Sequence, residues 1–247
     1  MAARIVAEEH ASRRHVVIAL SGAHAYGFPS PDSDLDLKGV HLEPAHRLLG
    51  LAPPAPSVER MEVVDGVEID YSSNEVLAVL QGILRGNGNY VERVLGSRIL
   101  LTSPEHETLV PVVRRALSRR LHRHYRGFAT GQLRELCSSP APTVKQVLYV
   151  LRTALTGAHV LLTGQVVPDL TLLCDEHGFE AARELIKKKR AGERTPLDAA
   201  DARRWRTEAE RAFAVLDAAL GRSCLPEQPP NREELQAWLL ELRRAHP

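Results

Sequence analysis

Apolar and polar positions change their period part-way along the chain. Before about residue 101 the apolar runs are short: residues 15–20 form a buried-strand run, residues 35–42 alternate, and residues 61–71 form two arms around Asp65-Gly66, a dipeptide typical of two-residue hairpin turns. After Ser103 the apolar positions recur at helical spacing. The pattern predicts an α/β domain followed by an all-α helical bundle.

Cap-like sequences indicate where the helices should begin. Ser72-Ser-Asn-Glu75 matches a capping box and predicts a helix from about Ser73 to Leu84, while Ser103-Pro104 supplies a cap and a first helical position. Thr143 caps a long predicted helix that ends near Thr163. Further helices are expected at residues 4–14, 90–95, 114–136, 180–189 and 199–220, and after a second capping box at Asn231-Arg-Glu-Glu234.

Composition and charge fit a chain of two parts. At 247 residues and 44% hydrophobic content, the chain can hold an α/β domain with a small mixed sheet at residues 1–110 and a helical domain at residues 111–247. The formal net charge of +1 hides an asymmetry, because the first part carries 9 Lys and Arg against 15 Asp and Glu, and the second 23 against 16. An acidic first domain suits a metal site, and a basic second domain suits an anion.

Cysteine and histidine spacing adds no further site. The three cysteines form no CxxC pair and the histidines outside the glycine turn have no ligand spacing, so neither a zinc site nor a disulfide framework is expected. No signal-peptide core and no apolar run of roughly 18 residues is present. We therefore expect a cytoplasmic protein without membrane contact; its oligomeric state is left open.

Three carboxylates form the clearest candidate for chemistry. Asp34 and Asp36 stand two residues apart on a predicted strand, so both side chains project from one face, and Asp70 lies on a second predicted strand. Three carboxylates can hold a pair of Mg²⁺ ions about 3.5–4 Å apart. An Asp-x-Asp pair alone is more often a solvated turn, but here a glycine turn precedes it and a third acidic strand follows.

The glycine turn before the carboxylates is a candidate phosphate site. Gly22-Ala23 follows the first strand, and a turn that begins a helix presents free backbone N–H groups to a phosphate. His24 could donate to a phosphate oxygen or serve only as a turn residue. A nucleoside triphosphate is the natural ligand of such a turn beside two metal ions.

These residues resemble the DNA polymerase beta nucleotidyltransferase superfamily, whose pattern is Gly-Gly or Gly-Ser, a spacer, Asp-x-Asp and a third Asp on another strand. More narrowly, several segments are similar to the RNA repair pathway polymerase-beta-like family (RlaP), and the similarity covers nearly the whole chain. These segments are Ala25-Tyr26-Gly27, Ser33 to Val40, Gly86-Asn87 with Glu92, and Leu225-Pro226-Glu227.

The resemblance implies roles for the acidic residues and the turn. Asp34 and Asp36 would bind two Mg²⁺ or Mn²⁺ ions, and Asp70 would be the third ligand and the base for the incoming hydroxyl. Glu68 points to the same face as Asp70 and is the alternative third carboxylate. Gly22 and Ala23 would contact the triphosphate, although Ala23 stands where the family often has Ser, at a cost of about 1 kcal/mol in lost hydrogen bonding.

Two sets of helical residues are candidates for binding substrates. Lys145, Tyr149 and Arg152 lie on one stripe of a predicted helix, which fits either a clamp on the triphosphate or a solvated charged face. The Arg-rich run from Arg114 to Phe128 suits a nucleic-acid backbone with stacked bases, or again a solvated face. Its acceptor candidates are Arg123, Tyr125, Arg126, Phe128 and, one turn on, Gln132. Lys187-Lys-Lys-Arg190 is expected to be the solvated end of a helix.

The sequence therefore predicts a metal-dependent nucleotidyltransferase that moves an NMP from an NTP, with ATP the first choice, to a hydroxyl acceptor and releases pyrophosphate. An RNA end is the acceptor that the family resemblance suggests. A small molecule or a protein side chain would use the same donor site. The rivals are a weakened nucleotide- or RNA-binding module and a metal phosphohydrolase, although this chain lacks the His and Asp clusters of the latter.

Overall fold

A computed structural model describes residues 1–247, and the chain divides into two compact units. The sheet unit comprises residues 1–22, 34–117 and 228–247, and the helical unit comprises residues 23–33 and 118–227. The division differs in detail from the predicted border at residue 110, because the last helix belongs to the sheet unit and the segment after the glycine turn belongs to the helical unit.

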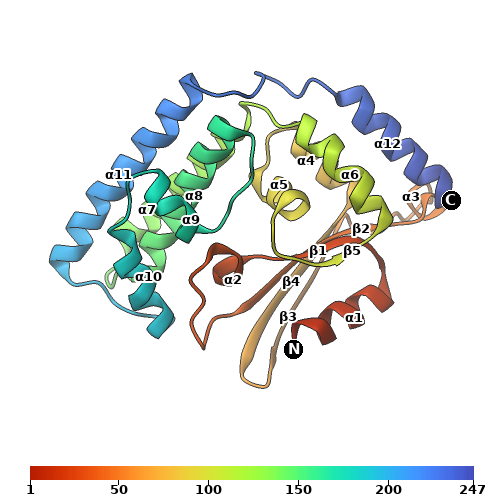
Figure 1. Ribbon diagram of the computed structural model, residues 1–247. Helices are drawn as coiled ribbons and strands as arrows, with labels where there is room; N and C mark the ends of the chain where they lie inside the picture. The colour runs from red at the N-terminus through yellow and green to blue at the C-terminus, as the bar shows by residue number, and fades with distance from the viewer. The chain divides into compact units, whose positions relative to one another are not determined.

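The sheet unit is built on a mixed five-stranded sheet of order β3-β4-β2-β1-β5 (Figure 1). Its strands are β1 (Arg14–Leu20), β2 (Leu35–Leu42), β3 (Ser57–Val64), β4 (Val67–Glu75) and β5 (Ile99–Thr102). Only β2 and β4 pair in parallel, while the other neighbours are antiparallel. Asp65 and Gly66 both have positive φ, as the predicted two-residue hairpin turn requires.

Alternation along β2 and β4 gives the sheet two different faces. Leu35 and Leu37 pack with Ile69 against Ile5 of α1 (Ala2–Ser12), and this cluster is buried. The intervening residues of both strands are polar and face the other side. Apolar burial on one face therefore fixes which face carries the carboxylates.

The polar face is partly covered by helices of the same unit. These are α4 (Val76–Leu84), α5 (Gly88–Leu95) and α6 (Pro104–Arg115), and the unit is completed by α3 (Ala45–Leu48) and α12 (Arg232–Ala245). Arg93 of α5 donates to the backbone carbonyl of Gly39 and bonds the side chain of Asn74. The helices thus cover the Asn74 end of β4, toward the carboxyl end of the strand.

The capping box predicted at residues 72–75 is wrong. Ser72 and Ser73 continue β4 in parallel register with Lys38 and Gly39, and the helix begins only at Val76, with Glu75 as the capping residue. Pairing with β2 satisfies the backbone of these serines, which outweighs a local capping preference. At α12 the helix is present, but Asn231 makes no side-chain capping bond.

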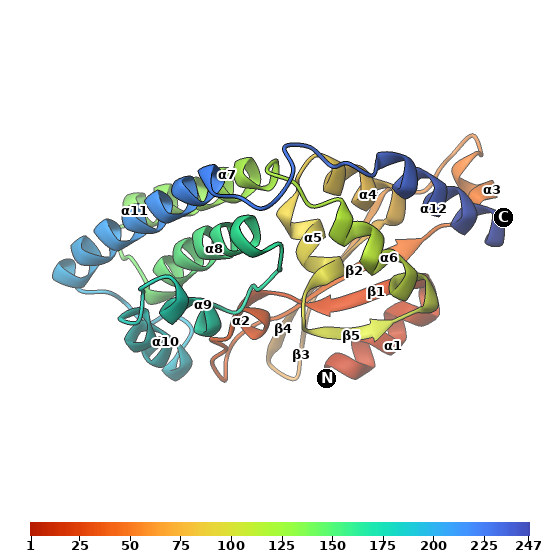
Figure 2. The same cartoon turned by 45° about the horizontal axis from the view of Figure 1, so that its top comes forward.

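The helical unit packs around one buried helix, α8 (Val144–Thr163), whose Thr143 capping box is formed as predicted. Its neighbours are α7 (Leu121–Ser138), α9 (Leu170–Glu176), α10 (Ala182–Ala191) and α11 (Ala199–Gly221), and α7 and α11 run alongside α8 (Figure 2). Gly157 allows close approach of α7, because an added Cβ would lie 2.6 Å from Cβ of Tyr125. The helix predicted at 114–136 begins only at Leu121, as α7, because residues 114 and 115 end α6, the helix that the Ser103-Pro104 start predicted.

The predicted fold class is confirmed: an α/β domain with a small mixed sheet is followed by a helical bundle. A short helix, α2 (Gly22–Tyr26), starts at the glycine turn, and its length was not predicted from the sequence. None of the helices combines the length and the apolar character that crossing a membrane demands.

Candidate active site

Two of the three predicted carboxylates meet on the polar face of the sheet. Asp36 of β2 stands directly opposite Asp70 of β4 in the parallel register, and adjacent strands are about 4.8 Å apart. Asp34 lies two residues before Asp36 and just before β2 begins, and its place in a shared metal site stays a prediction. All three side chains are partly exposed rather than buried. The sheet thus places Asp36 and Asp70 side by side, while the ligand atoms of the three carboxylates do not all lie within 4.8 Å of one another.

Gly22 is fitted to Asp36 so closely that no other residue can replace it without a shift. The backbone N–H of Ser21 donates to the carbonyl of Asp36 at 2.9 Å, which brings the turn against β2. Gly22 has φ +57°, and an added Cβ would lie 1.7 Å from Oδ2 of Asp36. The predicted glycine turn therefore also positions the Asp36 carboxylate.

One neighbour of the carboxylates was missed by sequence reasoning. The Lys38 ammonium donates to Oδ2 of Asp70 at 2.8 Å, and the two side chains are 20% and 40% exposed. Lys38 continues the alternation Asp34, Asp36, Lys38 along β2, so the period of two was the signal that could have found it. It offsets one of three crowded negative charges.

The second missed cation is Arg93, which the sequence placed only on a short helix. It is half-buried on α5, where desolvation lowers its pKa, and the Asp70 carboxylate is among the groups that oppose this shift. Arg93 therefore adds positive charge near Asp70.

The donor set fits Mg²⁺ or Mn²⁺. All candidate ligands on this face are carboxylate oxygens, which are the ligands that hard divalent cations prefer. Asp36 and Asp70 face each other across two hydrogen-bonded strands, and Glu68 lies two residues earlier on the same face of β4 but is exposed. The register opposite Asp36 favours Asp70 over Glu68 as the third carboxylate.

The predicted phosphate-binding stripe lies on α8 in the helical unit. Arg152 is 2% exposed, and its guanidinium stacks 3.6 Å from the ring centroid of Tyr26. Tyr149 makes edge contacts with Tyr26 and with Phe28, which follow the glycine turn in sequence. Two of the three residues are thus packed against the segment after Gly22, and their contact with a nucleotide stays a prediction.

Lys145, the third residue of the stripe, is already paired. Its ammonium forms an ion pair with Glu193, and hydrogen bonds from Lys145, Lys189 and Ser33 hold the pKa of Glu193 at about 2, although burial alone would raise it. Ala23 is buried and His24 is half-buried on α2. Their contact with a triphosphate also stays a prediction.

The run Lys187-Lys-Lys-Arg190 is not simply a solvated helix end. Lys189 is 0% exposed and donates to Ser30 Oγ at 2.8 Å, to Ser33 and to Glu193. Arg190 donates to the carbonyl of Gly27 at 2.6 Å. These bonds fix the loop that precedes Asp34 to α10. The expectation of a solvated end is wrong for the buried Lys189, whereas Arg190 is exposed.

The acceptor candidates on α7 separate into core and surface residues. Tyr125 is 1% exposed and packs at Gly157, so it serves the core rather than a stacked base. Arg126 pairs with Asp217 at 3.1 Å and stacks on Phe213, and Gln132 is only partly exposed. Arg123 and Phe128 remain exposed, with Phe128 stacked on the ring of His124.

A known protein family matches nearly the whole chain. The model of the RNA repair pathway DNA polymerase beta family (RlaP) matches residues 2–241. This chain belongs to that family. The predicted resemblance is therefore confirmed, and the family supports a nucleotidyltransferase-type function in an RNA repair pathway.

Two further proteins are similar to this RlaP chain. An uncharacterized protein of Methanocaldococcus jannaschii is 25% identical over 227 residues, which cover 90% of this chain and 91% of that protein. A solved structure of a nucleotidyltransferase-like protein from Exiguobacterium sibiricum has 14% sequence identity and a TM-score of 0.35, and the match covers 99% of this chain and 79% of that one.

Proposed function

We propose that this RlaP protein transfers a nucleoside monophosphate from an NTP to a hydroxyl group, with an RNA end as the acceptor and ATP as the first donor to test. The observation that carries the proposal is the register of Asp36 opposite Asp70, with Asp34 two residues before Asp36. Family membership supports the reaction class, and the name of the family supports RNA as the acceptor.

Each carboxylate has a part in this reaction. Asp34 and Asp36 would hold the metal ions, and Asp70 would act as third ligand and accept the proton of the attacking hydroxyl. Bound Mg²⁺ supplies Lewis-acid chemistry, which lowers the pKa of a hydroxyl and stabilises a pyrophosphate leaving group. Lys38 holds one oxygen of Asp70 and leaves the other free to face a substrate.

The chain also offers groups for the triphosphate. Gly22 lets the backbone approach Asp36 closely, so that N–H groups of the turn and a metal-binding carboxylate can meet one ligand. Arg152 and Lys145 supply positive charge from α8. Because Lys145 is paired with Glu193, binding of a phosphate by Lys145 requires exchange of one anion for another.

The experiment uses the purified full chain, Mg²⁺ or Mn²⁺, and each of the four NTPs labelled at the α-phosphate. RNA with a free 3′ hydroxyl is compared with the same RNA carrying a 3′ phosphate, and with no RNA. We expect label on the hydroxyl-ended RNA and release of pyrophosphate. Asp36→Asn should abolish both, whereas Asp65→Asn, the same change in the hairpin turn, should leave both unchanged.

Other outcomes identify the rivals. Label on the protein or on an added small molecule, but not on RNA, would reject the RNA acceptor and keep the reaction class. Free phosphate instead of pyrophosphate would indicate a phosphohydrolase. Saturable NTP binding with no turnover of any NTP, unchanged by Asp36→Asn, would make the protein a binding module and sink the enzyme assignment.

A further inference from the structure

A second group of metal-ligand side chains lies in the helical unit, apart in sequence from the three aspartates. His159 belongs to the buried helix α8, Glu176 is the last residue of α9, and His177 is the residue that caps the end of α9. The hydroxyl of Thr156 donates to the carbonyl of Val167 at 3.1 Å, which ties the connection between the helices to α8. This connection brings two residues from the end of α9 beside the His159 ring.

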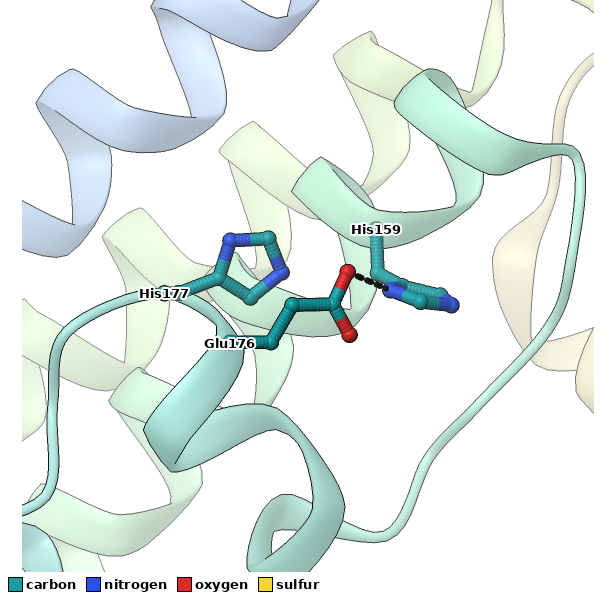
Figure 3. Close-up of side chains that lie close together, drawn as sticks. All are labelled: His159, Glu176 and His177. Atoms are coloured by element: carbon teal, nitrogen blue, oxygen red, sulfur yellow. Dashed lines mark hydrogen bonds and ion pairs between the residues drawn. The ribbon is translucent and has the colours of Figure 1, made fainter.

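The three side chains converge on one point (Figure 3). Nδ1 of His159 lies 3.0 Å from Oε1 of Glu176, and one ligand atom from each residue lies within 4.8 Å of the other two. The two imidazole rings are nearly perpendicular, with centroids 6.1 Å apart, and the Glu176 carboxylate lies between them. Such an arrangement lets two ring nitrogens and one oxygen approach the same ion from different directions.

Burial leaves a histidine ring nitrogen of this group without a hydrogen-bond partner. Nε2 of His177 is buried without a hydrogen-bond partner, and the side chain of His159 is 10% exposed. A buried ring nitrogen without a partner is uncommon, because it forfeits the hydrogen bonds that water gave it. A cation shared with Glu176 would satisfy the His177 nitrogen.

We propose that His159, Glu176 and His177 bind a zinc ion. Two imidazole nitrogens and one carboxylate oxygen form a donor set typical of Zn²⁺ with three protein ligands, whereas Mg²⁺ prefers oxygen alone. Glu176 is 46% exposed, so water can complete the fourth position from the solvent side. The ion ties the end of α9 to α8 and stabilises the helical unit.

The required adjustment is small. Ligand atoms in a zinc tetrahedron with bonds of about 2.0–2.1 Å are separated by about 3.3 Å. The 3.0 Å contact between His159 and Glu176 must therefore lengthen slightly, and the His177 nitrogen must move closer. Rotation of the exposed Glu176 side chain provides most of this change.

The test measures Zn²⁺ binding directly. The full chain, freed of metal by chelation and dialysis, is titrated with ZnCl₂ in a calorimeter in excess Mg²⁺, which saturates sites built from oxygen ligands. We expect one saturable site and a rise in Tm with Zn²⁺, because a ligand that binds only the folded state stabilises it. Co²⁺ used as a probe should give a visible spectrum without the near-ultraviolet band of a cobalt–thiolate bond, which separates this site from cysteine ligands.

Two variants and one matched control decide the assignment. His177→Gln and Glu176→Gln should each weaken Zn²⁺ binding at least about tenfold and remove the Tm rise. His122→Gln, the same change on α7, should leave both unchanged, and Asp36→Asn should also leave both unchanged, which makes the result independent of the proposed reaction. Glu176 is exposed, so its variant stays interpretable if His177→Gln fails to fold. Absence of saturable binding, or equal binding by both variants and wild type, would overturn the proposal.

Discussion

The sheet unit and the helical unit each gather charged side chains, and they neutralise them in opposite ways. Asp34, Asp36 and Asp70 of the sheet unit are partly exposed, and Lys38 forms an ion pair with Asp70. In the helical unit, the buried Lys189 and Glu193 are fully engaged with each other, with Lys145 and with two serines.

The difference distinguishes a candidate site for chemistry, the aspartates, from a cluster that holds the fold in place, the network around Lys189. Like charges that remain crowded and accessible are costly unless a cation from solution neutralises them, which is the property of a metal site. A charge that is buried and fully hydrogen-bonded holds its partners in place. Here Lys189 holds the loop before Asp34. Substitutions in the two clusters should therefore affect different measurements.

The largest effect is expected from a carboxylate of the sheet. Asp70→Asn removes the proposed ligand and base without changing volume, so kcat/KM for nucleotidyl transfer should fall about 10⁴-fold or more. Glu68→Gln, two residues earlier on the same face, should change kcat/KM less than about threefold. Neither should lower Tm. The reverse ranking of the two variants would assign the third carboxylate to Glu68.

The next effect is on stability and comes from the helical unit. Lys189→Met removes the buried ammonium from Glu193, Ser30 and Ser33, while Lys145 still pairs with Glu193, and should lower the free energy of unfolding by about 1.5–3 kcal/mol. Lys188→Met changes the neighbouring lysine, which is exposed and pairs with Asp201, and should cost less than about 1 kcal/mol.

Urea unfolding of both lysine variants measures this contrast. A double variant, Lys189→Met with Glu193→Gln, should recover part of the loss, because it also removes the carboxylate that has lost one of its two cations. Equal stability of the Lys189 and Lys188 variants would show that the buried network contributes nothing to the fold.

The same contrast explains which features of the fold and of the site could be predicted from the sequence. Local patterns predicted the Asp65-Gly66 hairpin, the strand at residues 35–42 and the helix capped by Thr143, because each depends on neighbouring residues alone. The three aspartates were predicted as one group because alternation on paired strands decides their face. In the structure Asp36 stands opposite Asp70 because β2 and β4 pair in parallel in this register.

What was missed depends on partners far away in the chain. The serines at 72 and 73 form a strand because β2, more than thirty residues earlier, pairs with them. Lys189 is buried because its serine partners precede it by 159 and 156 residues. His159 and His177 meet only because α9, a seven-residue helix without a clear apolar period, returns along α8. No local pattern contains this information.

A third, smaller effect concerns pH and the sheet core. Burial lowers the pKa of His15 to about 3 and that of His41 to about 4, so both rings are neutral in the folded protein. In the unfolded chain they gain protons as pH falls below about 6.5. Stability should therefore be fully present above that pH and decrease below it, by about 1.4 kcal/mol per pH unit for each histidine.

Urea unfolding at pH 7.5, 6.5 and 5.5 measures this slope. The window lies above the range in which the carboxylates of Glu105 and Glu193 titrate, since both have a pKa of about 2 in the folded state. His41→Asn can keep a hydrogen bond to Ser73 and should reduce the slope by about half, whereas the exposed His10→Gln should not. A flat profile from pH 7.5 to 5.5 would contradict the neutral, buried state of both rings.

The smallest effect is expected at a glycine, and it tests the link between backbone and carboxylate. Gly22 and Gly66 both have positive φ, so alanine at either position should cost about 1–2 kcal/mol of stability. Only at Gly22 does the new Cβ meet a side chain, Oδ2 of Asp36, because nothing lies within 4 Å at Gly66. Gly22→Ala should therefore also lower kcat/KM about tenfold by displacing Asp36, while Gly66→Ala should leave kcat/KM unchanged. Equal activity of the two variants at equal stability would show that Asp36 tolerates displacement. Asp34 and Asp70 would then be the more important carboxylates for activity.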